Sequence, residues 1–177
     1  MSELVGRVAT VILAVFLFFG LTVALFAQKQ DITIQNYVDD AAHEFIDTSR
    51  ATGYISASSY DRMVNRLDST GNVYDIEMTH YMEKQYPEFE NGQVVNYVTG
   101  YDTENTQDIL NQLYGTADEQ GEDAIGRCSM NTGDYIRIEI KNRNATLGGR
   151  LLAMIFLRQA GGGQIITSYG GYVGNEG

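Results

Sequence analysis

The sequence predicts an α+β protein in which one long N-terminal helix packs on a small, mainly antiparallel sheet. Three observations predict this fold. An uncharged and mostly apolar run occupies residues 8–27. An amphipathic helical pattern continues from this run without Gly or Pro as far as Thr52. Later segments alternate polar and apolar residues, which is typical of half-buried strands.

The apolar run reads VATVILAVFLFFGLTVALFA. As a helix it would be about 30 Å long, which matches the hydrocarbon core of a bilayer. We therefore divide the chain into a transmembrane anchor (1–28) and an extracytoplasmic domain (29–177). Cleavage of a signal peptide after Ala24, or of a prepilin-type leader after Gly6, are alternatives to this uncut anchor. The short N-terminal stub favours a single-pass topology with the C-terminal domain outside the cell.

The helix is predicted to extend beyond the membrane. Ile34, Val38, Ala41 and Phe45 follow the spacing i, i+4, i+7 and i+11, so they form one apolar stripe. Gly53 is a natural C-terminal cap, which gives one helix of about 45 residues. The default interpretation of the stripe is the core of its own domain, and the alternative is packing between subunits. For that alternative, the predicted packing positions are Phe16, Gly20, Ile34, Val38, Ala41 and Phe45.

The rest of the chain is predicted to hold short helices and strands. Strands are expected at Val73–Glu83, Gln93–Thr99, Tyr135–Lys141 and Gln164–Val173. Helices are expected after a cap at Ser56 or Ser58, after a cap at Thr103, and over Leu147–Leu157 with a start near Asn144. The last of these contains Arg150 and is too short to span a bilayer, so we predict a core helix.

Composition excludes some functions. The formal net charge is −11, so the chain lacks the basic footprint of an unassisted nucleic-acid binder. Most of the acidic residues precede Arg127, whereas the segment from Arg127 onward is net basic. The two parts could balance within one fold or meet across a subunit interface. A single cysteine, Cys128, excludes an internal disulfide bond.

Four local motifs carry a resemblance to a known family: FIDTSRATGYI (45–55), TGNVYDIEM (70–78), GDYIRIEIKN (133–142) and YGGYVGNE (169–176). With the order of helix and sheet, they resemble type IV pilin-like, membrane-anchored proteins of Gram-positive bacteria associated with tight-adherence (Tad) pili. The resemblance implies a pilin-like fold and a role in a surface appendage. Val11 stands where pilins carry a leader-proximal glutamate, which favours a minor or assembly role over a major pilin.

A search for chemistry finds no catalytic constellation, phosphate loop or dinucleotide motif. His43 and His80 lack a second His or Cys at ligand spacing, so we expect a surface histidine and a satisfied core histidine. The acidic segment 118–123 could bind calcium, but it lacks the ligand spacing of an EF-hand. We expect no cofactor and no metal.

The sequence therefore predicts a non-enzymatic, pilin-like structural or assembly subunit of a bacterial surface appendage. Its expected partners are the lipid bilayer, other pilin-like subunits including copies of itself, and the pilus assembly machinery. It would reside in the cell membrane or in a surface filament. The alternative is a membrane-tethered extracellular binding module that recognises a ligand, a cation or an envelope protein.

Overall fold

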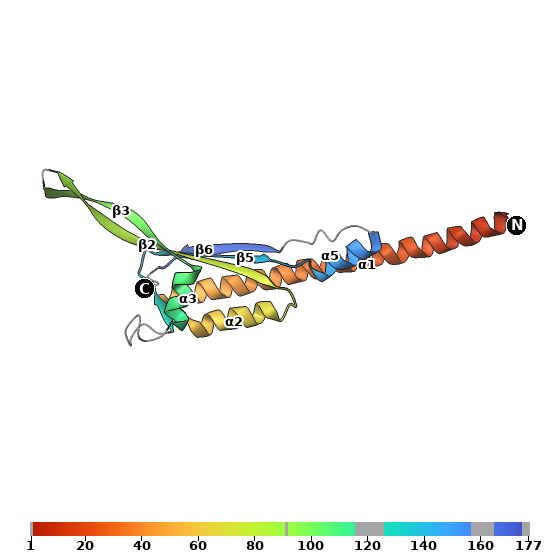
Figure 1. Ribbon diagram of the computed structural model, residues 1–177, viewed down its shortest axis with the longest axis horizontal. Helices are drawn as coiled ribbons and strands as arrows, with labels where there is room; N and C mark the ends of the chain where they lie inside the picture. The colour runs from red at the N-terminus through yellow and green to blue at the C-terminus, as the bar shows by residue number, and fades with distance from the viewer. Residues whose placement is uncertain (1, 91, 116–125, 157–164, 175–177) are drawn as a thin grey trace.

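The computed structural model describes residues 2–90, 92–115, 126–156 and 165–174. Within these ranges one long helix runs beside a four-stranded antiparallel sheet (Figure 1). The elements in chain order are α1 (Ser2–Thr52), β1 (Tyr54–Ser56), α2 (Ala57–Asp68), β2 (Tyr74–Glu90), β3 (Gln93–Asn105), α3 (Thr106–Tyr114), β4 (Arg127–Ser129), β5 (Tyr135–Asn142), α5 (Leu147–Phe156) and β6 (Ile166–Tyr172). The predicted α+β class is confirmed.

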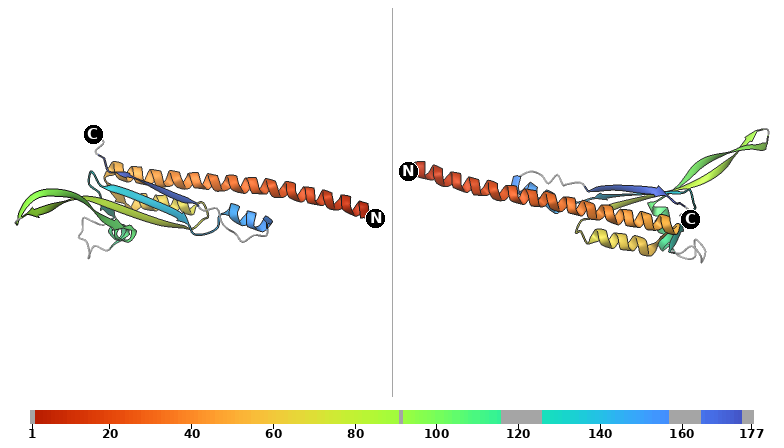
Figure 2. Two further views of the ribbon diagram at one scale, coloured as in Figure 1. Left: turned by 90° about the horizontal axis from the view of Figure 1, so that it is seen from above. Right: turned by 180° about the vertical axis from the view of Figure 1, so that it is seen from behind.

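Helix α1 has 51 residues and is therefore about 75 Å long. It begins six residues earlier than the predicted start at Val8, and it ends where expected. Gly53 adopts a left-handed φ of 73° and donates its N–H to the Ser49 carbonyl oxygen at 3.0 Å. A residue with a Cβ is strained in that conformation, so glycine ends the helix here. The N-terminal part of α1 projects beyond the domain. The C-terminal part of α1 packs against the rest of the domain (Figure 2).

The core lies between the C-terminal part of α1 and one face of the sheet. The strand order is β3-β2-β5-β6, and β1 pairs with β4 in a separate two-stranded sheet. Ile136, Ile138 and Ile140 of β5 are fully buried, as their alternation predicts. Opposite them, α1 contributes Val38, Ala41, Ala42, Phe45 and Ile46 to the same cluster. The default interpretation of the stripe, as core of its own domain, agrees with this packing.

One predicted helix cap is wrong, and α5 begins at Leu147, later than its expected start near Asn144. The cap of α3 is Asn105, whose Oδ1 accepts hydrogen bonds from the backbone N–H groups of Gln107 and Asp108. Thr103 instead pairs with Tyr81 inside β3, which runs six residues past the expected strand end. Asn144 accepts a hydrogen bond from the Val73 N–H, so the cap of α5 passes to Thr146. Ser56 caps α2, in agreement with the sequence.

Helix α5 forms, and none of its residues whose side chains are described belongs to the buried cluster between α1 and the sheet. Instead, α5 packs beside α1 on the side of the sheet that faces the N-terminus (Figures 1 and 2). Apolar composition predicts that a helix is removed from water, but it does not say what covers the helix.

The acidic and basic parts of the chain meet within the fold. Antiparallel pairing of β2 with β5 places Asp75 opposite Lys141. Arg143 forms an ion pair with Asp75 at 2.7 Å. Some of the charge asymmetry is therefore balanced inside the chain, as one of the two interpretations predicted.

Candidate functional site

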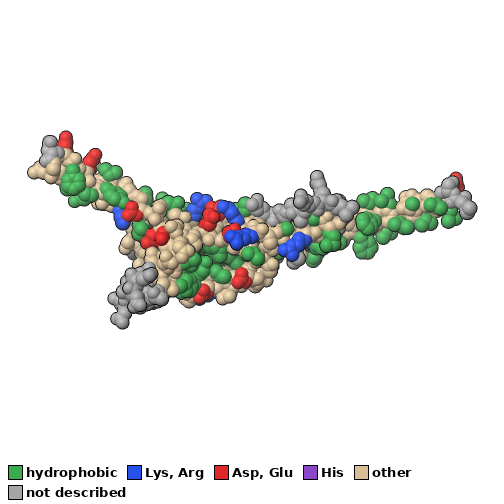
Figure 3. Space-filling view, viewed as in Figure 1, with side chains coloured by type: hydrophobic (Ala, Val, Ile, Leu, Met, Phe, Trp, Pro, Cys, Tyr) green, Lys and Arg blue, Asp and Glu red, His purple; other side chains and the backbone are tan. Residues whose placement is uncertain are grey.

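The first candidate surface is the N-terminal half of α1. The helix is long and apolar enough to cross a membrane, by length and composition. Phe16 is 68% exposed, and apolar side chains cover this part of the rod (Figure 3). Its two threonine hydroxyl groups donate within the helix, from Thr10 to the Gly6 carbonyl oxygen and from Thr22 to the Phe18 carbonyl oxygen, both at 2.9 Å. These side chains therefore add no unsatisfied polar group to an apolar surface.

The second candidate surface is a projecting hairpin, which we call the arm and define as residues 84–90 of β2 with 93–102 of β3. Beyond Tyr81, β2 pairs with β3 alone, because its pairing with β5 ends there. The arm then extends away from the domain, at the end opposite the N-terminus (Figure 1). A two-stranded ribbon is marginally stable in water, so its side-chain contacts matter.

The arm contains both polar contacts between its own side chains and exposed apolar side chains. Lys84 forms an ion pair with Asp102, and the Tyr86 hydroxyl donates to Asp102 at 2.6 Å. These hydrogen bonds and the charge of Lys84 hold the pKa of Asp102 below its ordinary value. Large apolar side chains that are about half exposed or more are Tyr86, Phe89, Val94, Val95, Tyr97, Val98 and Tyr101. Such a patch on a protruding ribbon is typical of a protein-binding surface.

One face of β3 in the arm carries two exposed tyrosines. Tyr97 and Tyr101 lie four residues apart on the same face of the strand, and their side chains are 59% and 52% exposed. Asn96 lies next to Tyr97 in sequence but on the opposite face of the ribbon. We call the side of the arm that carries Tyr97 and Tyr101 the arm face.

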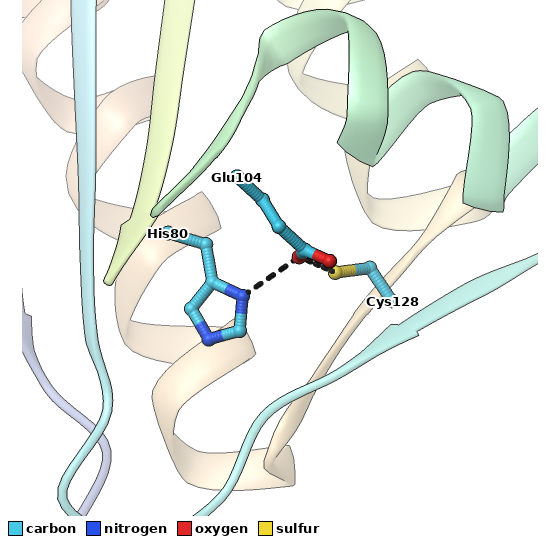
Figure 4. Close-up of side chains that lie close together, drawn as sticks. All are labelled: His80, Glu104 and Cys128. Atoms are coloured by element: carbon cyan, nitrogen blue, oxygen red, sulfur yellow. Dashed lines mark hydrogen bonds and ion pairs between the residues drawn. The ribbon is translucent and has the colours of Figure 1, made fainter. Parts of the chain in front are cut away.

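The third candidate is a buried polar cluster at the base of the arm, where β2, β3, β4 and the loop before β5 meet (Figure 4). His80 is 1% exposed. Its Nδ1 lies 3.0 Å from Glu104 Oε2, and its Nε2 lies 3.1 Å from Asp134 Oδ2. Glu104 also accepts hydrogen bonds from the Gln112 amide at 2.9 Å and from the Cys128 thiol at 3.7 Å.

Asp134 joins the cluster to two backbone N–H groups. Its Oδ1 accepts from the Glu83 N–H at 2.9 Å, and its Oδ2 accepts from the Asn131 N–H at 2.7 Å. Burial by itself would raise the pKa of Asp134. The N–H donors of Asn131 and Glu83, together with His80, outweigh burial and hold this pKa below its ordinary value. The cluster therefore fixes the turn before β5 against β2.

The cluster also contains the residues best placed to hold a metal. His80, Glu104 and Cys128 offer nitrogen, oxygen and sulfur atoms within 4.8 Å of one another, a donor set that suits zinc. Burial, followed by the charge of Glu104, raises the pKa of Cys128 to about 12. The thiol is therefore neutral at physiological pH, and each potential ligand atom already has a hydrogen-bond partner. In this state the geometry is that of a hydrogen-bonded structural cluster.

The predicted packing residues separate into two groups. Val38, Ala41 and Phe45 are buried inside the chain, and Ile34 is half-buried against the same core. Phe16 is exposed and Gly20 is half-buried on the bare part of α1. The stripe is thus occupied by the protein's own sheet, and the surface open to partners is the N-terminal half of α1.

The two histidines have the environments that the sequence predicted. His43 is exposed, and its ring stacks on Tyr169 with the centroids 3.8 Å apart. His80 is a satisfied core histidine. Its partners could not be identified from the sequence because Glu104, Cys128 and Asp134 are far from it along the chain. The acidic segment 118–123, where weak calcium binding was considered, lies outside the described residues.

Comparisons with known proteins do not assign a class. No protein-family model matches the chain, and neither a curated protein nor a solved structure matches it. The function must therefore be argued from the fold and from the three surfaces described above.

Proposed function

We propose that the chain is a non-enzymatic, pilin-like structural or assembly subunit of a bacterial surface appendage of the tight-adherence or type IV kind. Residues 8–27 anchor it in the cell membrane, and its C-terminal domain lies outside the cell. Its partners are the bilayer, other pilin-like subunits including copies of itself, and the assembly machinery. The observation that carries the proposal is α1, which is bare and apolar in one half and the spine of the domain in the other.

The apolar side chains on the N-terminal half of α1 need to be removed from water. Val11, Phe16, Phe18 and Leu21 are each more than 60% exposed, and the charged residues nearest to them are Arg7 and Lys29. A contiguous apolar surface of this size is unfavourable in water. Lipid covers it before assembly, and the equivalent helices of neighbouring subunits cover it in a filament. Because α1 is one continuous helix, the segment that is covered by lipid or by neighbouring helices is rigidly joined to the domain.

A shearing experiment tests this proposal. The full chain is expressed with its neighbouring pilus proteins, and surface filaments are sheared from intact cells and separated from membranes. We expect the chain in the sheared fraction together with other pilin-like subunits, while an integral membrane marker stays with the cells. Recovery as a monomer in membranes, with the neighbouring proteins present, would contradict the subunit role.

The arm favours a second candidate, a membrane-tethered binding module. The arm has exposed aromatic side chains. Its two strands reach the end of the domain that is farthest from the N-terminus of α1 (Figure 1). This position suits recognition of a separate envelope or surface protein. The same fractionation separates the two candidates, because a binding module would stay in the membrane fraction while capturing its partner through the arm face.

A further inference from the structure

The segment between β5 and β6 leaves the sheet and returns to the same point. At that point the Asn142 N–H donates to the Ile165 carbonyl oxygen at 3.1 Å. The Ile165 N–H donates back to the Asn142 side-chain oxygen at 2.8 Å. Helix α5 belongs to this excursion, and it lies along α1 toward the N-terminus, beyond the end of the sheet (Figure 2).

The start of α5 is fastened to α1. Thr146 is fully buried, and its hydroxyl oxygen accepts the Gly149 N–H at 3.1 Å as the helix cap. The same hydroxyl donates to Asp31 Oδ2 at 2.8 Å. The carboxylate of Asp31 therefore sits at the N-terminus of α5, where the helix dipole favours negative charge. These contacts fix the position of α5 along α1.

Glycine allows the two helices to approach closely. A Cβ added to Gly148 would lie 2.7 Å from the Ala27 carbonyl oxygen and 2.5 Å from Asp31 Oδ2. Ala27 is 0% exposed, and Val23 and Ala24, one turn nearer the N-terminus, are half-buried. Their neighbours Leu21, Leu25 and Phe26 stay exposed. Small residues at a close helix crossing are typical of helix packing inside membranes.

The position of this contact along α1 determines how deep α5 would lie in a bilayer that α1 spans. Ala27 is the last residue of the apolar run, and α5 extends from there toward the N-terminus. Its ten residues span about 15 Å, which is half the thickness of the hydrocarbon core. Helix α5 therefore runs beside the half of the apolar segment that is nearer the domain.

The composition of α5 suits this depth. Its sequence LGGRLLAMIF carries one charge, Arg150, in its first part. The exposed Arg150 side chain donates to the Ala145 carbonyl oxygen, which lies outside the helix start, so its charge is directed back toward the domain. Met154, one turn farther along, is 75% exposed. A large apolar side chain this exposed, on a helix that lies along the apolar run of α1, continues the surface that lipid would cover.

We propose that α5 is a re-entrant helix that enters the outer leaflet beside α1, with lipid acyl chains as the occupant of its exposed side. This inference rests on the membrane anchor in the proposed function. It makes the anchor a pair of helices on the outer side and a single helix on the inner side. The crossing at Gly148 and Ala27 then limits how the domain can tilt relative to the membrane.

Depth-dependent quenching tests the proposal on the full chain in phosphatidylcholine nanodiscs. Cys128 is replaced by Ala, and an environment-sensitive fluorophore is attached to one new cysteine at a time. Met154→Cys reports on α5, Phe16→Cys on the apolar run of α1, and Tyr97→Cys on the arm. All three positions are more than half exposed in the protein, so cover by the protein itself does not separate them. Doxyl-labelled lipid and aqueous iodide are the two quenchers.

We expect positions 154 and 16 to be quenched by doxyl lipid and to lose iodide quenching, with the opposite result at position 97. Lipid quenching at 16 together with iodide quenching at 154 would overturn the inference and leave the anchor intact. Iodide quenching at both 16 and 154 would overturn the anchor and the proposed function with it.

Discussion

At the residue scale, Asp134 shows how one side chain joins distant segments. It accepts hydrogen bonds from backbone N–H groups of its own turn and of β2, and it contacts buried His80. Both ring nitrogens of His80 lie within hydrogen-bond distance of a carboxylate, Nδ1 of Glu104 and Nε2 of Asp134. The buried polar groups of the cluster therefore have partners, in a position where an unpaired polar group would be costly.

Replacing Asp134 should destabilise the protein. Asp134→Ala removes the acceptor for two backbone N–H groups and for His80, so we expect a loss of about 3–5 kcal/mol in the free energy of unfolding. Asp75→Ala removes one exposed ion pair with Arg143 and should cost about 1 kcal/mol or less. Chemical denaturation of the full chain in nanodiscs, followed by circular dichroism, measures both. Equal losses would show that the cluster does not stabilise the fold.

The lowered pKa of Asp134 also predicts the direction of acid sensitivity. Because the folded-state pKa lies below the unfolded value of about 3.9, the unfolded chain binds the proton more readily. The stabilisation is fully present above about pH 4 and is lost as the pH falls through the lowered pKa. Asp134→Asn should remove this part of the pH dependence, while the remaining carboxylates keep theirs.

At the scale of single elements, glycine positions decide which helix surfaces can touch. Gly6 and Gly148 both lie inside helices, but an added Cβ meets nothing within 4 Å at Gly6 and meets Asp31 and Ala27 at Gly148. Close approach of a partner helix at Gly20 stays a prediction. Within the described chain, α5 approaches α1 closely at Gly148.

The matched pair Gly148→Ala and Gly6→Ala separates this contact from helix propensity. Gly6→Ala should be neutral or stabilising by up to about 1 kcal/mol, because alanine is the better helix former. Gly148→Ala should push α5 away from α1 and cost about 1–3 kcal/mol despite the same gain in propensity. Hydrogen exchange of α5 amides in nanodiscs should then increase in the Gly148 variant alone. Unchanged protection would contradict the close approach.

At the scale of the whole molecule, the chain is a rod with a different surface at each end. The bare half of α1 is one end, and the arm lies at the other (Figures 1 and 3). The core between them buries the amphipathic stripe, so the exposed apolar side chains of the bare half of α1 and of the arm lie apart from it. Under the proposed function, a subunit anchored at one end and extended at the other could reach a neighbour displaced along the rod.

The adjacent pair Tyr97→Ser and Asn96→Ser tests the arm face. Tyr97 is 59% exposed and contributes little to the core, so both variants should unfold like the parent. If the arm face binds a partner, Tyr97→Ser should weaken association roughly tenfold or more, as expected for a buried aromatic at an interface. Asn96→Ser, on the opposite face, should not. Copurification from cells and unfolding temperature are the two readouts, and equal effects on association would exclude the arm face.

The sequence by itself determined the elements whose signal is local. The apolar run, the amphipathic stripe, the glycine that ends α1 and the alternation of β5 each depend on neighbouring residues, whose periodicity fixes a helix or strand. Local patterns were weaker at the ends of elements. Thr103 and Asn105 are both competent caps, and cross-strand pairing of Thr103 with Tyr81 decided between them.

The tertiary structure alone decided what each element faces. His80 meets Glu104, Cys128 and Asp134 because strand register brings together residues that lie far apart in the chain. Burial of the α1 stripe in the chain's own core, rather than in an interface, depends on where the sheet docks. The same holds for α5. Its apolar sequence predicts that it is removed from water, but its position beside α1 is set by the close crossing at Gly148.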